Sequence, residues 1–131
     1  MIIVDTNVIA YLYLPGPRVL QAEALRREDS YWVAPPLWRS EFGSVLALNL
    51  RKGLVTRAEA LDAWSKAEHQ MEGNECPASM EMVLDLATKS GCSAYDCEFV
   101  ALAKEFGIRL VTADRQVLAA FPETAVSLDS F

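Results

Sequence analysis

Short apolar runs alternate along this chain with longer stretches that have the periodicity of helices. The runs over residues 1–5 and 108–112 have the length and composition of buried strands. The intervening stretches are helical in period and are interrupted by turn formers such as Pro15-Gly16-Pro17. Strands that alternate with helices indicate an α/β fold in which helices flank a central parallel sheet on its faces.

The same patterns predict the bounds of each element. Strands are expected over residues 1–5, 31–34, 108–112 and 123–128, with the last at the edge of the sheet. Helices are expected over residues 6–14, 18–28, 37–52, 56–71, 80–89, 94–106 and 114–121. Residues 73–79 are predicted to be a loop with room for one short strand. The buried face of helix 37–52 is predicted to hold Phe42, Val45, Leu46 and Leu50.

Length and composition predict one domain over residues 1–131. A chain of 131 residues, 52% of them hydrophobic, can build one sizeable core and has no room for a second. It has no run of about 18 apolar residues, so we expect no membrane span. The first residues lack the basic segment of a signal peptide. The odd number of cysteines, without a CxxC pair, predicts free thiols at Cys76, Cys92 and Cys97 and a cytoplasmic location.

Four acidic residues occupy positions where an α/β fold places chemistry. Asp5 ends the first strand, and Asp114 lies two residues beyond the strand that closes at Thr112. Ligands bind outside the carboxyl ends of parallel strands, so these carboxylates face each other if the two strands are neighbours. Asp96 lies at the start of helix 94–106, and Glu41 lies in the first turns of helix 37–52. Both helix starts can point toward the same edge of the sheet.

Each acid also has a structural interpretation. Asp5 and Asp114 can be the N-caps of the helices that follow them, and Ser93 with Asp96 has the spacing of a capping box. Glu41 has the weakest such alternative, because an unpaired charge in an apolar stretch is costly. If the acids are only caps, the chain is a non-catalytic α/β binding module or a receiver-like domain. A receiver domain fits poorly, however, because Asp5 has no acidic neighbour and no lysine follows Thr112.

Clustered carboxylates suit Mg²⁺ or Mn²⁺, which prefer oxygen ligands. Such ions bind phosphate oxygens, activate water and stabilise a leaving oxygen, which is the chemistry of phosphodiester hydrolysis. His69 is the one histidine, so cleavage by two histidines is excluded and a Ser-His-Asp triad is disfavoured. The net charge of −6 counts against a nucleic-acid partner. A metal site of four carboxylates would nevertheless account for four of these six charges, and bound cations would reverse the local field.

Four segments resemble motifs of the PIN-domain family, in the family's order and spacing. They are MIIVDTNVIA, WRSEF, AYDCEFVALAKEFG and LVTADRQVL, which together extend from Met1 to about Leu118. The resemblance implies a three-layer α/β sandwich with a central parallel sheet. It also implies an active site in which Asp5, Glu41, Asp96 and Asp114 bind Mg²⁺ or Mn²⁺ and cleave RNA.

The resemblance further implies supporting residues and partners. Thr6, Asn7 and Thr112 match polar positions that orient metal, water or phosphate in the family. The length of the chain is similar to that of VapC-type toxins, which implies a small antitoxin as partner and a homodimer. Cys97 stands where the family often has alanine, and because cysteine is small and commonly buried we expect this difference to change little.

Overall fold

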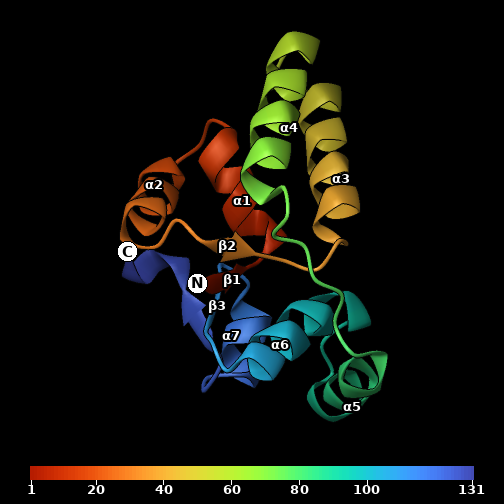
Figure 1. Ribbon diagram of the computed structural model, residues 1–131. Helices are drawn as coiled ribbons and strands as arrows, with labels where there is room; N and C mark the ends of the chain where they lie inside the picture. Colours follow the sequence, from red (N-terminus) through yellow and green to blue (C-terminus); the bar gives the residue numbers. More distant parts are fainter.

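A four-stranded parallel sheet with the strand order β2-β1-β3-β4 forms the centre of the molecule (Figure 1). The computed structural model describes residues 1–131. The strands are β1 (Ile2–Val4), β2 (Trp32–Val33), β3 (Leu110–Thr112) and β4 (Ala125–Ser127). The helices are α1 (Thr6–Tyr13), α2 (Val19–Glu28), α3 (Trp38–Arg51), α4 (Arg57–Met71), α5 (Met80–Ser90), α6 (Ala94–Phe106), α7 (Arg115–Ala120) and the short 3-10 helix η1 (Leu128–Ser130).

The helices form two layers on opposite faces of the sheet. In Figure 1, α1 to α4 lie above the strands and α5 to α7 lie below them. The strands β1 and β3 are therefore apolar and buried throughout, as expected for a parallel sheet covered on both faces. The three-layer α/β sandwich predicted from the sequence is confirmed.

The structure confirms the predicted elements and shortens several of them. The strand expected over residues 108–112 begins only at Leu110, and the final edge strand covers Ala125–Ser127. The predicted loop over residues 73–79 contributes a single bridge, between Glu75 and Ala34. The sequence pattern did not predict η1, whose three residues are too few to show a period.

One residue of the predicted buried face lies elsewhere. Phe42 and Leu46 are buried as expected and Val45 is partly buried, but Leu50 is 40% exposed. The reason is visible in Figure 1, where α3 and α4 extend together beyond the body of the molecule. The two helices contact each other near the sheet through aromatic rings. The ring centroid of Trp64 lies 5.6 Å from that of Trp38 and 6.1 Å from that of Phe42. The apolar periodicity of α3 therefore continues beyond the part of the helix that packs on the core, and Leu50 lies in that outer part.

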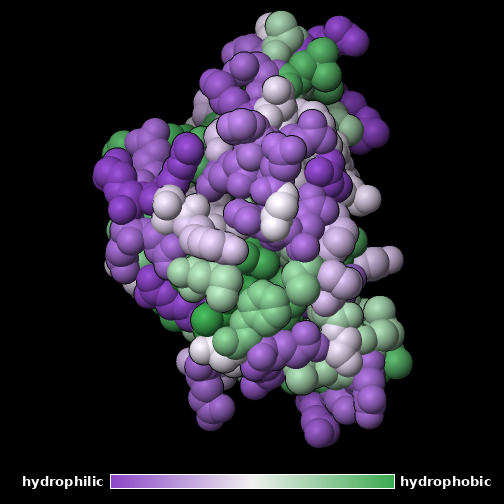
Figure 2. Space-filling model, viewed as in Figure 1, coloured by the Kyte–Doolittle hydropathy of each residue, from purple (hydrophilic) through white to green (hydrophobic).

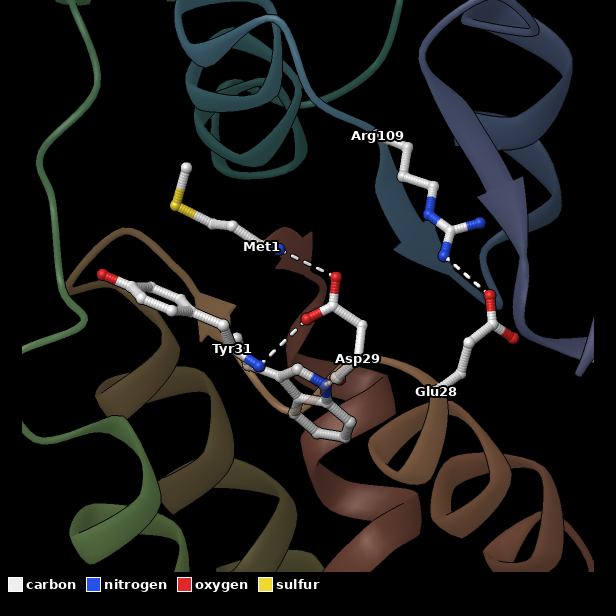
Figure 3. Close-up of polar contacts among 6 residues, drawn as sticks. Met1, Glu28, Asp29, Tyr31 and Arg109 are labelled. Atoms are coloured by element: carbon white, nitrogen blue, oxygen red, sulfur yellow. Dashed lines mark hydrogen bonds and ion pairs between the residues drawn. The ribbon is translucent and has the colours of Figure 1, made fainter.

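The amino-terminal edge of the sheet is held by ion pairs (Figure 3). Asp29 accepts hydrogen bonds from the Met1 ammonium at 2.8 Å and from the backbone N–H of Tyr31 at 3.0 Å. Arg109, which precedes β3, contacts Glu28 at 3.2 Å. Burial acts to raise the pKa of Asp29, but the hydrogen bonds from Met1 and Tyr31 hold it below its usual range. At this edge, each acid faces a cation.

The three cysteines are free in the structure. Cys92 and Cys97 are buried, and Cys76 is partly exposed. Cys97 is a buried residue of α6, as is common for a free cysteine. None of the helices combines the length and the apolar character that crossing a bilayer requires.

Candidate active site

The four predicted acids line one pocket at the carboxyl edge of the sheet. Its volume is about 350 Å³. The lining residues are Asp5, Thr6, Asn7, Glu41, Ser44, Val45, Asp96 and Asp114. Asp5 and Asp114 come together because β1 and β3 are neighbours, paired in register at Ile3 with Leu110. The condition that the sequence left open, that these two strands are adjacent, is met.

Each acid stands at the start of a helix. Asp5 is the N-cap of α1 and Asp114 the N-cap of α7, while Asp96 and Glu41 lie in the first turns of α6 and α3. Four helix amino termini thus meet at this edge, and their backbone dipoles favour negative charge there. This arrangement explains how the fold keeps four carboxylates close together without a basic residue among them.

Asp5 is both a cap and a pocket residue. Its Oδ1 accepts a hydrogen bond from the backbone N–H of Thr6, and its Oδ2 accepts one from the hydroxyl of Thr112, both at 2.7 Å. The residue is only 8% exposed. Burial raises the pKa of Asp5 to about 6, against the two hydrogen bonds and with smaller repulsion from Asp96 and Glu41. Its carboxylate is therefore held rigidly and lacks a positive partner.

Asp114 uses one oxygen as a cap and leaves the other free. Oδ1 accepts hydrogen bonds from the backbone N–H groups of Gln116 at 2.8 Å and Val117 at 3.1 Å, whereas Oδ2 has no protein donor. For Asp5 and Asp114, the cap and the site residue are the same side chain. The two interpretations of the sequence are therefore compatible at these positions.

At Asp96, the expected capping box is only half formed. The Ser93 hydroxyl accepts a hydrogen bond from the backbone N–H of Asp96 at 3.1 Å, but the Asp96 carboxylate does not return a bond to the Ser93 backbone. The carboxylate faces the pocket instead. Burial raises the pKa of Asp96, and the charge of Asp114 adds to this effect.

Glu41 is held in the pocket by α1. Its Oε1 accepts a hydrogen bond from the Thr6 hydroxyl at 2.8 Å. Burial raises the pKa of Glu41, and the charges of Asp96 and Glu98 raise it further. Thr6 is thus one of the partners that the apolar surroundings of Glu41 were expected to require. The contribution of Glu98 was not anticipated.

The three predicted supporting residues have different positions. Thr6 and Asn7 line the pocket, and Asn7 accepts a hydrogen bond from the backbone N–H of Ala113 at 3.3 Å. Thr112 is fully buried beneath it, where its hydroxyl donates to Asp5 and accepts from the backbone N–H of Asp114 at 3.0 Å. Ser44 was missed, although its place three residues after Glu41 on one helix puts both on the same face.

The pocket matches a divalent cation in its chemistry. Its charged lining side chains are all carboxylates, and a cation would offset the repulsion and the burial that raise the pKa values of Asp5, Glu41 and Asp96. No three acidic, histidine or cysteine side chains are grouped closely enough to hold an ion among them. Mg²⁺ usually keeps several waters and takes only one or two carboxylates directly. The residues therefore fit a hydrated ion of this kind.

Comparison with known proteins gives results consistent with this geometry. The PIN domain profile matches residues 2–124. Ribonuclease VapC3 of Pyrobaculum aerophilum is 32% identical over 133 residues, which cover 92% of this chain and 95% of that protein. PAE2754 of Pyrobaculum aerophilum has a similar crystal structure, with a TM-score of 0.78 and 22% identity over 98% of this chain and 90% of that one. FitAcB of Neisseria gonorrhoeae has a TM-score of 0.73 and 18% identity over the whole of both chains. The two structures show similarity of fold.

Proposed function

The chain belongs to the PIN-domain family, and we propose on this basis that it is an Mg²⁺- or Mn²⁺-dependent endoribonuclease, the toxin of a toxin–antitoxin pair. The observation that carries the proposal is the meeting of Asp5, Glu41, Asp96 and Asp114 in one pocket. The 32% identity to a protein named as a ribonuclease supports RNA as the substrate.

The four carboxylates would hold a hydrated ion, one or two of them directly and the others through its bound water. When bound, the ion supplies charge stabilisation at the phosphate and lowers the pKa of a water. Neighbouring residues of the chain hold these carboxylates in position. Thr112 fixes the Asp5 carboxylate against the end of β3, and Thr6 orients Glu41. Asn7, with its amide oxygen engaged by Ala113, has its amide N–H groups available to a substrate oxygen.

In the proposed reaction, water attacks the phosphorus atom of an RNA phosphodiester. The bond between phosphorus and the leaving ribose oxygen breaks, and that oxygen gains a proton. No side chain needs to form a covalent intermediate, and the pocket lining contains no cysteine, histidine or lysine. Catalysis then depends on where the carboxylates place charge and water.

The test is cleavage of RNA by the purified protein with Mg²⁺ or Mn²⁺ and with EDTA. We expect cleavage that requires the ion and stops with EDTA. A matched control is Asp85→Asn, which removes an exposed carboxylate from α5 and should leave cleavage unchanged. Equal cleavage in EDTA would overturn the proposed mechanism.

The competing function is a binding module whose acids are only caps, an idea that the hydrogen bonds of Asp114 favour. Calorimetric titration with Mn²⁺ separates the two. The nuclease predicts binding that weakens when Asp96, whose carboxylate caps nothing, is changed to asparagine. The module predicts no binding that depends on Asp96.

For the antitoxin, we propose the apolar groove between α3 and α4 as its binding surface. The groove, of about 420 Å³, is lined by Arg39, Gly43, Leu46, Ala47, Leu50, Arg57, Ala60, Leu61 and Trp64. Leu50 and Leu61 are 40% and 50% exposed, and an exposed apolar groove suits an amphipathic helix. Co-purification from the native host with wild type and Leu61→Asp tests this surface, and light scattering of the isolated chain tests the proposed homodimer.

A further inference from the structure

Two adjoining pockets lie between α1, α2 and α4. Unlike the acidic pocket, they are lined mainly by polar and basic residues. The two adjoin through Tyr13, Arg26 and Lys66, which line both, and have volumes of about 540 and 340 Å³. Their other lining residues are Leu12, Glu23, Arg27, Ser30, Ser65, His69 and Gln70. We call this surface the basic groove. It contains three Lys or Arg side chains and the one histidine of a chain whose net charge is −6.

The cations of the basic groove are available to a ligand. Elsewhere, Arg39 is bound by Glu68 and Glu75, and Arg109 by Glu28. Arg26 and Arg27 have no ion-pair partner and are exposed. Lys66 contacts Asp62 at 2.9 Å, in a pair that is 62% exposed at both residues and that solvent screens.

Hydrogen-bonding groups accompany these charges. The Tyr13 hydroxyl donates to the Gln70 amide oxygen, and the Gln70 amide nitrogen has no hydrogen-bond partner. Burial raises the pKa of Tyr13, and the charges of Arg26 and Lys66 act against the rise, which places both cations within electrostatic reach of the hydroxyl. The groove therefore presents guanidinium and ammonium groups, with one carboxylate from Glu23, beside the Tyr13 hydroxyl, whereas the Gln70 amide nitrogen is buried.

The composition of the groove selects the class of ligand. Leu12 and Tyr13 are the only hydrophobic lining residues of the two hollows, so an amphipathic helix would find little apolar surface there. Such a surface exists instead between α3 and α4. Arginine side chains pair well with phosphate oxygens, and a basic groove that includes an aromatic ring is typical of single-strand binding. Figure 2 shows hydrophilic residues gathered over α2 and α4.

We propose that the basic groove binds the phosphate backbone of single-stranded RNA away from the cleaved bond. The inference rests on the proposed ribonuclease function, because four carboxylates repel an RNA backbone and affinity must come from cations elsewhere. Helix α1 connects the two sites, with Thr6 and Asn7 in the acidic pocket and Tyr13 in the groove. At 1.5 Å per residue, Thr6 and Tyr13 are about 10 Å apart along the helix, a span that a few nucleotides cover.

The test measures RNA binding in EDTA, where no cleavage is expected. A fluorescein-labelled single-stranded RNA of about 20 nucleotides is titrated with wild type and with the triple variant R26Q/R27Q/K66Q over a range of salt concentrations. Removal of three phosphate contacts should lower the slope of log K against log salt by about 2, and affinity at 0.1 M salt by about 10- to 100-fold. Cleavage of a dinucleotide, whose single phosphodiester occupies the acidic pocket and does not reach the groove, should be unchanged.

Two further variants keep the result interpretable. R51Q/K52Q/K89Q removes the same charge from exposed residues outside the groove and should leave the slope near that of wild type. The single variant R26Q removes one phosphate contact and should lower the slope by about 0.7, so it is the informative variant if the triple variant does not fold. Equal slopes for the triple variant and its control would overturn the inference.

Competition with poly-glutamate separates RNA from an acidic protein partner. We expect RNA to displace the labelled strand at far lower concentration than poly-glutamate of equal charge. Equal displacement would assign the groove to an acidic polypeptide and overturn the RNA assignment. The proposed function fails separately: RNA binding through the groove without cleavage in Mn²⁺ would refute the ribonuclease, whereas cleavage with groove-independent binding would refute only this inference.

Discussion

Two aspartates at opposite edges of one sheet have opposite electrostatic environments. Asp29, at the amino edge, faces the Met1 ammonium, and its pKa is lowered. Asp5, at the carboxyl edge, faces other carboxylates, and burial raises its pKa to about 6. The ion pair with Met1 stabilises the charged form of Asp29. Burial destabilises the charged form of Asp5, so ionisation of Asp5 at neutral pH lowers the stability of the fold. The difference supports the proposal that the carboxyl edge binds a cation.

The largest difference between the two edges should appear in activity. Asp5→Asn keeps the shape of the side chain and most of its capping ability but weakens metal binding. Cleavage should fall at least about 100-fold if the ion lowers the barrier by several kcal/mol. Asp29→Asn, the matched control, should cleave RNA at the wild-type rate. A folded Asp5→Asn protein with a near-normal rate would show that Asp5 is only a cap.

The pH dependence of stability should separate the edges next. Because the pKa of Asp5 is raised from 3.8 to about 6 on folding, its contribution is most favourable below pH 4 and is lost as the pH rises through 6. The shift corresponds to about 3 kcal/mol at most. In EDTA, Asp5→Asn should therefore be more stable than wild type above pH 6, and the two should converge below pH 4. Urea denaturation at each pH measures this, and a constant difference across pH 4 to 7 would contradict the raised pKa.

Asp96 tests whether repulsion or capping controls the pocket. Its carboxylate caps nothing, so Asp96→Asn in EDTA should be at least as stable as wild type while losing activity. In wild type, a cation at about 100 times its Kd adds roughly 2.7 kcal/mol of stability, and this gain should shrink in the variant. The measurement is a pair of thermal melts for each protein, with Mn²⁺ and with EDTA. If the variant melts well below wild type in EDTA and gains as much from Mn²⁺, Asp96 leaves the proposed site.

The smallest effect is expected at the amino edge itself. Asp29→Asn removes a partly exposed ion pair, which is worth about 0–1 kcal/mol. The lowered pKa means that this stability is present above the usual pKa of an aspartate and is lost as the pH falls through the lowered value. The variant should therefore be slightly less stable than wild type at pH 7 and equal to it in strong acid. A loss of several kcal/mol at pH 7 would show that the pair is more important than its exposure suggests.

Local sequence patterns predicted most of the secondary structure. Helix starts could be found because caps act within a few residues, as in the Thr56 and Glu59 capping box at the start of α4. The predictions were least accurate for burial, which depends on tertiary packing and not on the local sequence. Leu50 follows the helical period of α3 but lies beyond the part of the helix that the core covers.

The sequence alone determined which acids stand at the ends of strands and the starts of helices, because strand ends and helix caps are defined by neighbouring residues. Tertiary structure decided which of them meet. Thr112 and Asp5, 107 residues apart, are joined by a hydrogen bond only because β3 pairs with β1, and Thr6 reaches Glu41 only because α3 packs on α1. The basic groove likewise takes its lining from three helices. Distances between such residues depend on strand order and helix packing, which no local pattern in the chain encodes.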